Sequence, residues 1–422
     1  MKSNRYDLIV VGAGASGLMA AITAARRRIR VLVLDHHTDP AKKILATGNG
    51  KCNFTNKMQG SSCYRCDDPA FVLRVLRQFD EKQAIRFFEQ LGVPCKERQG
   101  YCYPRTGQAS SIRNALLSEA YRLNITILND IGIQLIKKTD DRFCVQTKSG
   151  HFYSAACVLA AGGKASAKTG SDGSGYIYAK KLGHTIHEPL PALVPLVSDD
   201  TWLKDTKGVR ADARVTLMAD GEEIASDTGE VQMTDYGISG IPVFQVSRFA
   251  SVALKLGRET TAKLDFLPEI SETDLREVLQ RQAAVYEKQK NWEEILSGLV
   301  NAKLAAMVCR RLHMSSEPII FKNKDQKEKQ LLSLSRQLKG TFVHIVKTKG
   351  FEQAQVTCGG IAVEEIQSGT MESALVSGLF FAGEIVDVDG ICGGYNLQWA
   401  WASGYCAGIH AANLAGKGQI YE

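Results

Sequence analysis

Three glycines close to the N-terminus have the spacing needed to bind a phosphorylated ligand. Gly12, Gly14 and Gly17 form G-x-G-x-x-G, between an apolar run and an alanine-rich stretch. In such a motif the first glycine allows a tight turn, the second lets backbone N–H groups approach a pyrophosphate, and the third lets a helix pack close to a strand. The N-terminus of that helix adds unpaired N–H groups and a partial positive charge. The spacing therefore predicts a site for a diphosphate.

The elements around these glycines strengthen the prediction. Residues 6–11 predict a buried strand, residues 18–28 a helix, and residues 30–34 a second strand that ends at Asp35. A carboxylate at that point can accept hydrogen bonds from a ribose diol. A lone G-x-G-x-x-G is weak evidence, but this order of elements indicates a Rossmann-like dinucleotide-binding domain.

A polar loop, residues 42–56, follows the second strand. Its density of glycine, asparagine and threonine predicts a loop rather than a regular element. The functional interpretation is a loop that closes over a dinucleotide, with Lys43 and Lys51 near its phosphates. The alternative is an ordinary polar connection.

Longer motifs carry a resemblance to a known family. They are residues 46–56, 159–163, 169–173, 181–184 and 191–196, and then 359–361, 370–373, 381–390 and 393–400. On these motifs the chain resembles the BaiN-like (YhiN-like) family of FAD-dependent oxidoreductases, some members of which are labelled aminoacetone oxidases. Lys51 stands where the family usually has arginine, and Ile241 interrupts a Ser-Gly-Pro pattern.

The resemblance implies a function. It implies FAD as the cofactor and reduction of a carbon–carbon double bond conjugated to a ketone, with a steroid-like enone as one precedent. No second G-x-G-x-x-G follows a strand, so either NAD(P)H docks transiently as the electron donor or the electrons come from another donor. The alternatives are a flavin amine oxidase of the aminoacetone type and a flavin-bearing protein that binds or modifies RNA.

Both ends of the chain are expected to contact the FAD. The strand that ends at Gly383 and Glu384 would bring an acid to the ribityl or ribose hydroxyls, and the helix that begins at Gly393 would direct amide groups at the flavin ring. Ile133 would contact the adenine through backbone atoms. The full set of predicted cofactor contacts is Gly12, Gly14, Ala15, Ser16, Gly17, Asp35, Lys43, Thr47, Gly48, Asn49, Lys51, Cys52, Asn53, Ile133, Ala161, Gly162, Gly163, Gly383, Glu384, Gly393, Gly394, Tyr395, Asn396 and Leu397.

Reduction of an enone needs a proton donor, and the sequence does not single one out. The candidate catalytic residues are Tyr103, His184, Tyr236 and Tyr395. Cys63 and Cys66 form a C-x-x-C pair, but they lack the helix start that activates redox-active dithiols. No metal site is predicted.

The fold class predicted is α/β, with a discontinuous domain. Residues 1–190 and 356–422 are expected to form the Rossmann-like FAD-binding domain, and residues 191–270 and 339–355 a β-rich insert domain. Residues 196–270 alternate and predict strands, with a hairpin turn at Asp220-Gly221. Residues 271–338 change to a helical period and predict a helical insert, with Ser271 as the cap of its first helix. Within the first domain, residues 71–92 predict one amphipathic helix.

Composition excludes several classes of protein. The 422 residues are 44% hydrophobic and 23% charged, which is ordinary for a globular protein. Eleven scattered cysteines argue against a secreted disulfide framework and favour a reducing compartment, the cytoplasm. The charge of +7 is spread without a dense basic tract, so nucleic acid is an unlikely partner. Residues 390–416 contain no Asp, Glu, Lys or Arg, as a membrane span would, but glycines and the polar residues Asn396, Gln398, His410 and Asn413 interrupt them and predict a buried helix.

Overall fold

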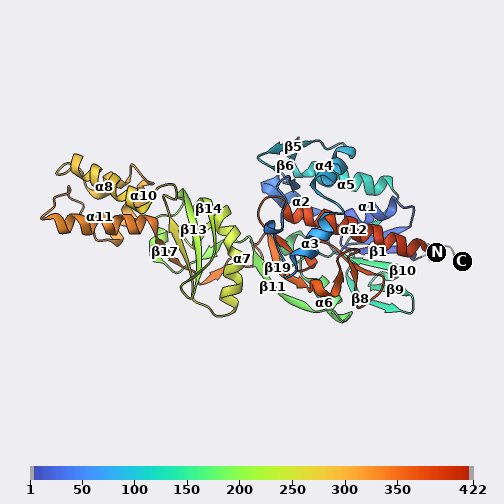
Figure 1. Cartoon of the computed structure of the whole chain (residues 1–422). Helices are drawn as coiled ribbons and strands as arrows, with labels where there is room; N and C mark the ends of the chain where they lie inside the picture. The colour runs from blue at the N-terminus through green and yellow to red at the C-terminus, as the bar shows by residue number, and fades with distance from the viewer. Residues whose placement is uncertain (1–3, 418–422) are drawn as a thin grey trace. The chain divides into compact units, whose positions relative to one another are not determined.

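The computed structural model describes residues 4–417, which form two compact units. The first unit comprises the chain up to Leu190 and from Gln355 onwards, and the second is Pro191–Ala354. Each unit is built around its own hydrophobic core. Figure 1 identifies the elements of both.

A parallel sheet forms the centre of the first unit. Residues such as Leu8 to Val11 are buried along the whole strand, as expected where both faces of a sheet are covered. This confirms the predicted α/β class. The parallel strands, in spatial order, are β22 (Leu379–Phe381), β10 (Gly150–Leu159), β1 (Arg5–Val11), β2 (Val31–Leu34) and β7 (Thr126–Leu128).

Antiparallel strands extend this sheet. A turn at Lys148 and Ser149 joins β9 to β10, with Thr147 opposite Gly150. Together the strands make a nine-stranded sheet, counted over the described residues. The added strands are β8 (Ile133–Thr139), β9 (Arg142–Thr147), β20 (Ile366–Gln367) and β21 (Glu372–Ser373).

Two helices from opposite ends of the chain pack together beside the sheet. They are α1 (Ala15–Ala25) and α12 (Tyr395–Lys417), which lie side by side in Figure 1. A Cβ atom at Gly404 would lie 2.4 Å from the carbonyl oxygen of Ser16, and one at Gly408 would lie 2.4 Å from that of Ala20. Because these glycines are four residues apart, they share one helix face, and the two backbones meet there directly. No helix in the described stretch has the length and apolar character needed to cross a membrane.

The prediction of one helix over residues 71–92 is wrong. The structure has α3 (Pro69–Leu76) and α4 (Glu81–Gln90) instead. Asp80 accepts a hydrogen bond from the Gln83 backbone at 2.8 Å while the Gln83 side chain accepts one from the Asp80 backbone at 2.9 Å. This capping box starts a second helix inside an apolar pattern that reads as continuous.

Shorter elements complete the first unit. Three small sheets pair β11 with β19, β23 with β4, and β6 with both β3 and β5. The bounds are α2 (Lys42–Ala46), β3 (Thr55–Asn56), β4 (Tyr64–Arg65), β5 (Cys95–Arg98), β6 (Tyr101–Pro104), α5 (Ala109–Arg122), α6 (Ser174–Lys181), β11 (Ile186–Ala192), β19 (Val356–Ile361), the short 3-10 helix η6 (Gly383–Ile385) and β23 (Asp389–Gly390).

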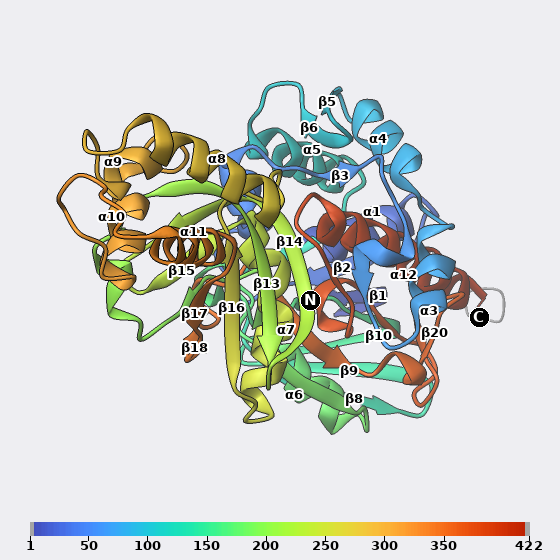
Figure 2. The ribbon, with the colours of Figure 1, turned by 60° about the vertical axis from the view of Figure 1, so that its left-hand side comes forward.

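The second unit contains an antiparallel sheet. Asp220 and Gly221 both have positive φ, at 51° and 82°, and form the predicted hairpin turn between β13 and β14. Figure 2 shows β13, β14 and β16 side by side. In spatial order the strands are β17 (Thr341–His344), β16 (Thr260–Asp265), β13 (Arg210–Ala219), β14 (Glu222–Met233), β15 (Gly237–Gly240), β12 (Leu196–Val197) and β18 (Lys347–Thr348).

One helix of this unit was not expected. Residues 196–270 predict alternating strands, but α7 (Ile241–Lys255) lies among them and packs on β13 and β14. Gly240 has a φ of 110°, which ends β15, and Pro242 occupies the first turn of the helix. Buried residues at 243, 246, 250 and 253 then have helical spacing.

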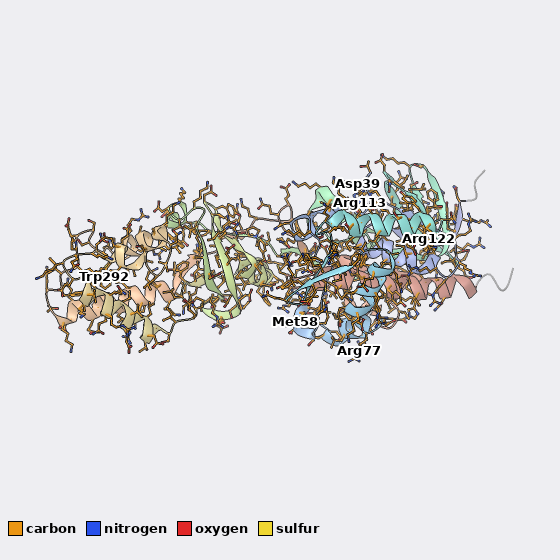
Figure 3. The ribbon with its side chains drawn as sticks, turned by 90° about the horizontal axis from the view of Figure 1, so that it is seen from above. Asp39, Met58, Arg77, Arg113, Arg122 and Trp292 are labelled. Atoms are coloured by element: carbon orange, nitrogen blue, oxygen red, sulfur yellow. The ribbon has the colours of Figure 1, made fainter. Side chains whose placement is uncertain are left out.

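Four further helices share the core of the second unit with the sheet. Ser271 accepts a hydrogen bond from the Asp274 backbone at 3.1 Å and caps the first of them, as predicted. Trp292, labelled in Figure 3, is buried, and its Nε1 donates to Gln330 at 3.0 Å. The helices are α8 (Glu272–Val285), α9 (Trp292–Leu296), α10 (Ala302–Arg311) and α11 (Lys324–Lys339).

Candidate functional site

The glycine turn between β1 and α1 leaves an open space at one glycine only. Gly12 has a φ of 103°, and a Cβ there would lie 2.4 Å from the Ala160 carbonyl oxygen. A Cβ at Gly17 would lie 1.9 Å from the Gly12 carbonyl oxygen. By contrast, Gly14 has a φ of −78°, and its Cβ would meet no protein atom within 4 Å. Packing therefore requires glycine at positions 12 and 17, whereas the open space beside Gly14 can hold a bound ligand.

The start of α1 suits an anion. Gly14 is its N-cap residue, and no side chain caps the helix there. The N–H groups of the first turn therefore point to the same open space, with the positive end of the helix dipole behind them. The residues present fit a diphosphate group, as the sequence predicts.

Asp35 lies at the edge of this turn. One carboxylate oxygen accepts from the Ala13 backbone at 2.5 Å and the other from the His37 backbone at 2.7 Å. Each oxygen keeps a further lone pair for a hydroxyl group. The loop beyond is held by an ion pair between Asp39 and Arg113 of α5, which lie next to each other in Figure 3.

A second cluster joins Lys43 to the C-terminal segment. Lys43 Nζ lies 2.7 Å from Glu384 Oε2. Glu384 Oε1 accepts from both the backbone and the hydroxyl of Thr357, at 2.9 and 2.8 Å. A Cβ at Gly163 would lie 2.6 Å from the same oxygen. The structure thus pairs Lys43 with the acid at 384, and Thr357, which nothing in the local sequence marks, holds that acid in place.

Gly383 is the point where three segments meet. It has a φ of 80°, and a Cβ there would lie 2.3 Å from the Ser16 hydroxyl. Its N–H donates to Ser403 Oγ at 2.9 Å, and its carbonyl accepts from Trp399 Nε1 at 3.1 Å. The start of α1, the end of β22 and the middle of α12 are therefore fixed to one another here.

The loop predicted over residues 42–56 is wrong in its first part, because Lys42–Ala46 form the helix α2. The rest of it, residues 47–56, meets the predicted glycine pair before α12. Asn56 Nδ2 donates to the Gly393 carbonyl at 3.0 Å, and Thr55 Oγ1 donates to Gln398 Oε1 at 2.6 Å. A Cβ at Gly394 would lie 2.9 Å from the Thr55 carbonyl oxygen. Residues from the two ends of the chain are thus in direct contact. The predicted contacts omit Asn56, Thr55 and Gln398, although all three belong to motifs that carry the family resemblance.

Other predicted contacts hold the site's loops together. The Asn396 side chain donates to and accepts from the Gly390 backbone, at 2.8 Å each way. Asn53 Oδ1 accepts from the Cys102 backbone at 3.1 Å, and Thr47 Oγ1 donates to the Ile44 carbonyl at 2.6 Å. The carbonyl of Ile133 accepts from the Tyr178 hydroxyl at 2.8 Å.

The remaining predicted contacts differ in exposure. Gly48 and Asn49 both have positive φ, at 54° and 53°. Lys51 is exposed and Cys52 is buried. Ala161, Gly162 and Leu397 are half-buried in the first unit.

Two of the candidate proton donors lie at this junction. Tyr103 is half-buried on β6, and its ring is 3.9 Å from where a Cβ of Gly48 would be. Tyr395 begins α12, and its ring is 3.1 Å from where a Cβ of Gly393 would be. Burial raises the pKa of the Tyr103 phenol and of the Tyr395 phenol. Both phenols are therefore protonated at neutral pH and can donate a hydrogen bond.

The other two candidates have different surroundings. The His184 side chain is fully buried, with Nδ1 3.0 Å from Glu365 Oε2 and Nε2 2.9 Å from Ser373 Oγ. Burial lowers the pKa of His184. With both nitrogens engaged, this environment favours a structural role over proton donation. Tyr236 belongs to the second unit, where Lys349 Nζ lies 3.9 Å from its ring centroid.

The C-x-x-C pair lacks an activated thiol at Cys66. All eleven cysteines lie in the described stretch, and none forms a disulfide there. Burial raises the pKa of Cys66 to about 12, so the thiolate form needed for redox exchange is scarce at neutral pH.

Comparisons with known proteins agree with this geometry. The model of the HI0933-like protein Rossmann domain family matches residues 6–410. The chain is 41% identical to 3-dehydro-bile acid delta(4,6)-reductase of Clostridium scindens, covering 96% of this chain and 98% of that one. It is 28% identical to ribosomal RNA dihydrouridine synthase of Escherichia coli, covering 96% and 97%.

A solved structure shows the same fold. It is 3-ketosteroid-delta4-(5alpha)-dehydrogenase of Rhodococcus jostii in complex with 4-androstene-3,17-dione, with a TM-score of 0.50 and 17% identity over 97% of each chain. At this level of identity the likeness concerns the fold alone.

Proposed function

This chain belongs to the family of HI0933-like proteins and is an FAD-dependent oxidoreductase, and from that premise we propose that it reduces a carbon–carbon double bond conjugated to a ketone. The proposed substrate class is a steroid-like enone, and the proposed electron donor is NAD(P)H. The observation that carries the proposal is the 41% identity to a delta(4,6)-reductase of a 3-dehydro bile acid, over nearly the full length of both chains. The open space at Gly14 and the uncapped start of α1 support the cofactor.

The chain's own residues would bind the cofactor in three places. The first turn of α1 would bind the diphosphate through the backbone N–H groups of Ala15, Ser16 and Gly17. Asp35 would accept hydrogen bonds from a ribose, and Glu384 would face the ribityl hydroxyls. Bound FAD supplies hydride transfer at N5 of its ring.

Reduction of an enone also needs hydrogen-bond donors. When a hydride adds to the β-carbon, negative charge collects on the ketone oxygen, and the α-carbon must then be protonated. Tyr103 and Tyr395 are the donors we propose, because both phenols are protonated at neutral pH and both adjoin glycines of the predicted cofactor loops. The buried, doubly bonded His184 is the weaker candidate.

A second candidate function uses the same chemistry on a different substrate. Two relatives, 28% and 29% identical over 96% of this chain, are named ribosomal RNA dihydrouridine synthases. The double bond of uracil that is reduced in dihydrouridine is also conjugated to a carbonyl group. The candidate is therefore reduction of a uridine in RNA.

Anaerobic stopped-flow measurements test these candidates. The holoenzyme is reduced with NADH or NADPH and then mixed with a 4-en-3-oxo steroid, with oxygen, or with transcribed ribosomal RNA, while flavin absorbance is followed. The proposal expects reoxidation by the steroid, with a product heavier by two hydrogens. Reoxidation by RNA with a two-hydrogen gain at uridine would favour the second candidate. Rapid reoxidation by oxygen alone, after reduction by an amine such as aminoacetone, would refute both in favour of an oxidase.

Variants test the role of the tyrosines. Tyr103→Phe and Tyr395→Phe each remove one hydroxyl, and loss of the true proton donor should slow reoxidation by the enone by about 10²- to 10⁴-fold. Tyr121→Phe is the matched control, because Tyr121 is exposed on α5. Flavin content should stay the same in all three. If neither site variant slows the reaction, the proton comes from another group.

A further inference from the structure

We propose that Asp67, His187 and Asp387 form a binding site for one divalent transition-metal ion in the first unit. None of these residues belongs to the predicted cofactor contacts, and the sequence analysis expects no metal. The three residues come from segments far apart in the chain: Asp67 follows β4, His187 lies in β11, and Asp387 follows η6.

The donor atoms have the separation that one ion requires. One ligand atom from each residue lies within 4.8 Å of the other two. His187 Nδ1 and Asp387 Oδ2 are 2.8 Å apart. Ligand atoms at about 2.0–2.2 Å from an ion are themselves about 3 to 4.4 Å apart, so small side-chain adjustments bring all three onto one ion.

Asp387 is oriented by its backbone surroundings. Its Oδ1 accepts a hydrogen bond from the Gly359 N–H at 3.0 Å, and its own N–H donates to the Ile361 carbonyl at 3.0 Å. Both partners belong to β19. With Oδ1 held by the backbone, Oδ2 faces His187, which is how an outer hydrogen bond orients a metal-binding carboxylate.

The electrostatic surroundings favour a cation. An open cavity of about 570 Å³ adjoins Asp67 and is also lined by Asp68, Glu364 and Arg74. Arg74 Nη2 is 2.9 Å from Asp68 Oδ2, so its charge is already balanced. The charges of Asp67 and Glu364 remain, and the cavity gives a hydrated ion a path to Asp67.

The donor set indicates the kind of ion. One imidazole and two carboxylates suit Zn²⁺, Mn²⁺ or Fe²⁺, whereas Mg²⁺ and Ca²⁺ prefer oxygen ligands alone. Three protein ligands leave coordination positions for water. A bound ion would link β11 and the residues after β4 to the segment between Glu384 and β23. The strand β23 itself pairs with β4. It would therefore stabilise the segment that leads to Gly393 and Gly394.

Metal binding to the purified holoenzyme tests the proposal. The protein is treated with a chelator, dialysed and titrated with Mn²⁺, whose free form is counted by electron paramagnetic resonance, and then with Zn²⁺ in competition. We expect one ion per chain and a higher unfolding temperature when it is bound. Loss of an outer-shell partner weakens metal binding by about 10- to 100-fold, and loss of a ligand should weaken it at least that much.

Five variants make the test specific. Asp67→Asn, His187→Ala and Asp387→Asn each remove one proposed ligand. Asp68→Asn changes the neighbouring acid and keeps its capping function, and His344→Ala removes a His–Asp pair with the same 2.8 Å separation in the second unit. His344→Ala should bind the ion as the wild type does, and Asp68→Asn should weaken binding by less than about tenfold, although it leaves the Arg74 charge unpaired. Asp67 is exposed, so Asp67→Asn keeps the test valid even if a more buried variant misfolds.

Two results would overturn the proposal. One is a wild-type protein that binds neither Mn²⁺ nor Zn²⁺ at millimolar concentration, in which case His187 and Asp387 form a simple ion pair. The other is binding that the three ligand variants retain, or that the two controls lose to the same degree. Flavin content is measured in each variant, so failure of the FAD assignment is seen separately.

Discussion

Gly14→Val should separate cofactor binding from folding. The backbone of Gly14, with φ −78° and ψ −170°, is one that valine adopts readily, and the added side chain would meet no protein atom within 4 Å of its Cβ. Valine is a poorer N-cap residue than glycine, and this should lower the unfolding free energy by no more than about 1 kcal/mol. The side chain would instead fill the space assigned to the diphosphate.

The expected loss of affinity follows from the contacts at α1. A hydrogen bond to a charged group contributes about 1.5–3 kcal/mol, so displacing the diphosphate from two backbone N–H groups should cost about 3–6 kcal/mol. That corresponds to a dissociation constant for FAD weaker by about 10²- to 10⁴-fold. The assay is visible flavin absorbance per protein after purification, followed by titration of the apoprotein with FAD.

Two further variants control this experiment. Gly369→Val is matched, because its Cβ also meets nothing within 4 Å and its φ is not positive, and it should keep its flavin. Gly17→Ala is the contrast, because its Cβ would lie 1.9 Å from the Gly12 carbonyl oxygen, and it should reduce stability as well as flavin content. If Gly14→Val binds FAD as tightly as the wild type does, the diphosphate does not lie at this turn.

Two other predictions concern stability. Burial lowers the pKa of His184 from its usual 6.5, opposed by Glu365, so below pH 6.5 the unfolded chain binds a proton that the folded chain does not. The free energy of unfolding should therefore fall as the pH drops below 6.5, by at most about 1.4 kcal/mol per pH unit. Chemical denaturation between pH 7 and pH 5 should show a smaller fall for His184→Gln than for the wild type. Equal pH dependence of the two proteins would contradict this assignment. Gly404→Val should lower the free energy of unfolding by about 1–3 kcal/mol or more, because its Cβ would lie 2.4 Å from the Ser16 carbonyl oxygen. Gly416→Val is the control in thermal melts, because its Cβ would meet nothing within 4 Å. Equal stability of the two variants would show that the backbones of α1 and α12 can move apart at Gly404 without loss of stability.

Local patterns in the sequence were sufficient to predict the order of the strands and the helix near the N-terminus. The strand, glycine turn, helix and second strand that end at Asp35 depend on neighbouring residues, and they occur in the predicted order, although the helix is Ala15–Ala25 rather than residues 18–28. The hairpin turn at Asp220 and Gly221 and the cap at Ser271 are local for the same reason. The break between α3 and α4 was missed because the apolar period continues across the capping box at Asp80.

Contacts between distant segments could not be read from the sequence. Glu384 is recognisable as an acid after a strand, but its partners Lys43 and Thr357 are set by the crossing of separate strands and loops. His184 is an equal candidate for catalysis in the sequence, and only its burial against Glu365 and Ser373 marks it as structural.

The sequence by itself determined that this chain has a glycine turn suited to a dinucleotide, because the spacing of glycines, apolar runs and an acid is a local property. Only the tertiary structure decided which of those glycines faces open space and which faces a backbone carbonyl. It also brought Asp67, His187 and Asp387 within 4.8 Å of one another. The reason is that side-chain separation depends on how distant segments pack, and no pattern along the chain records it.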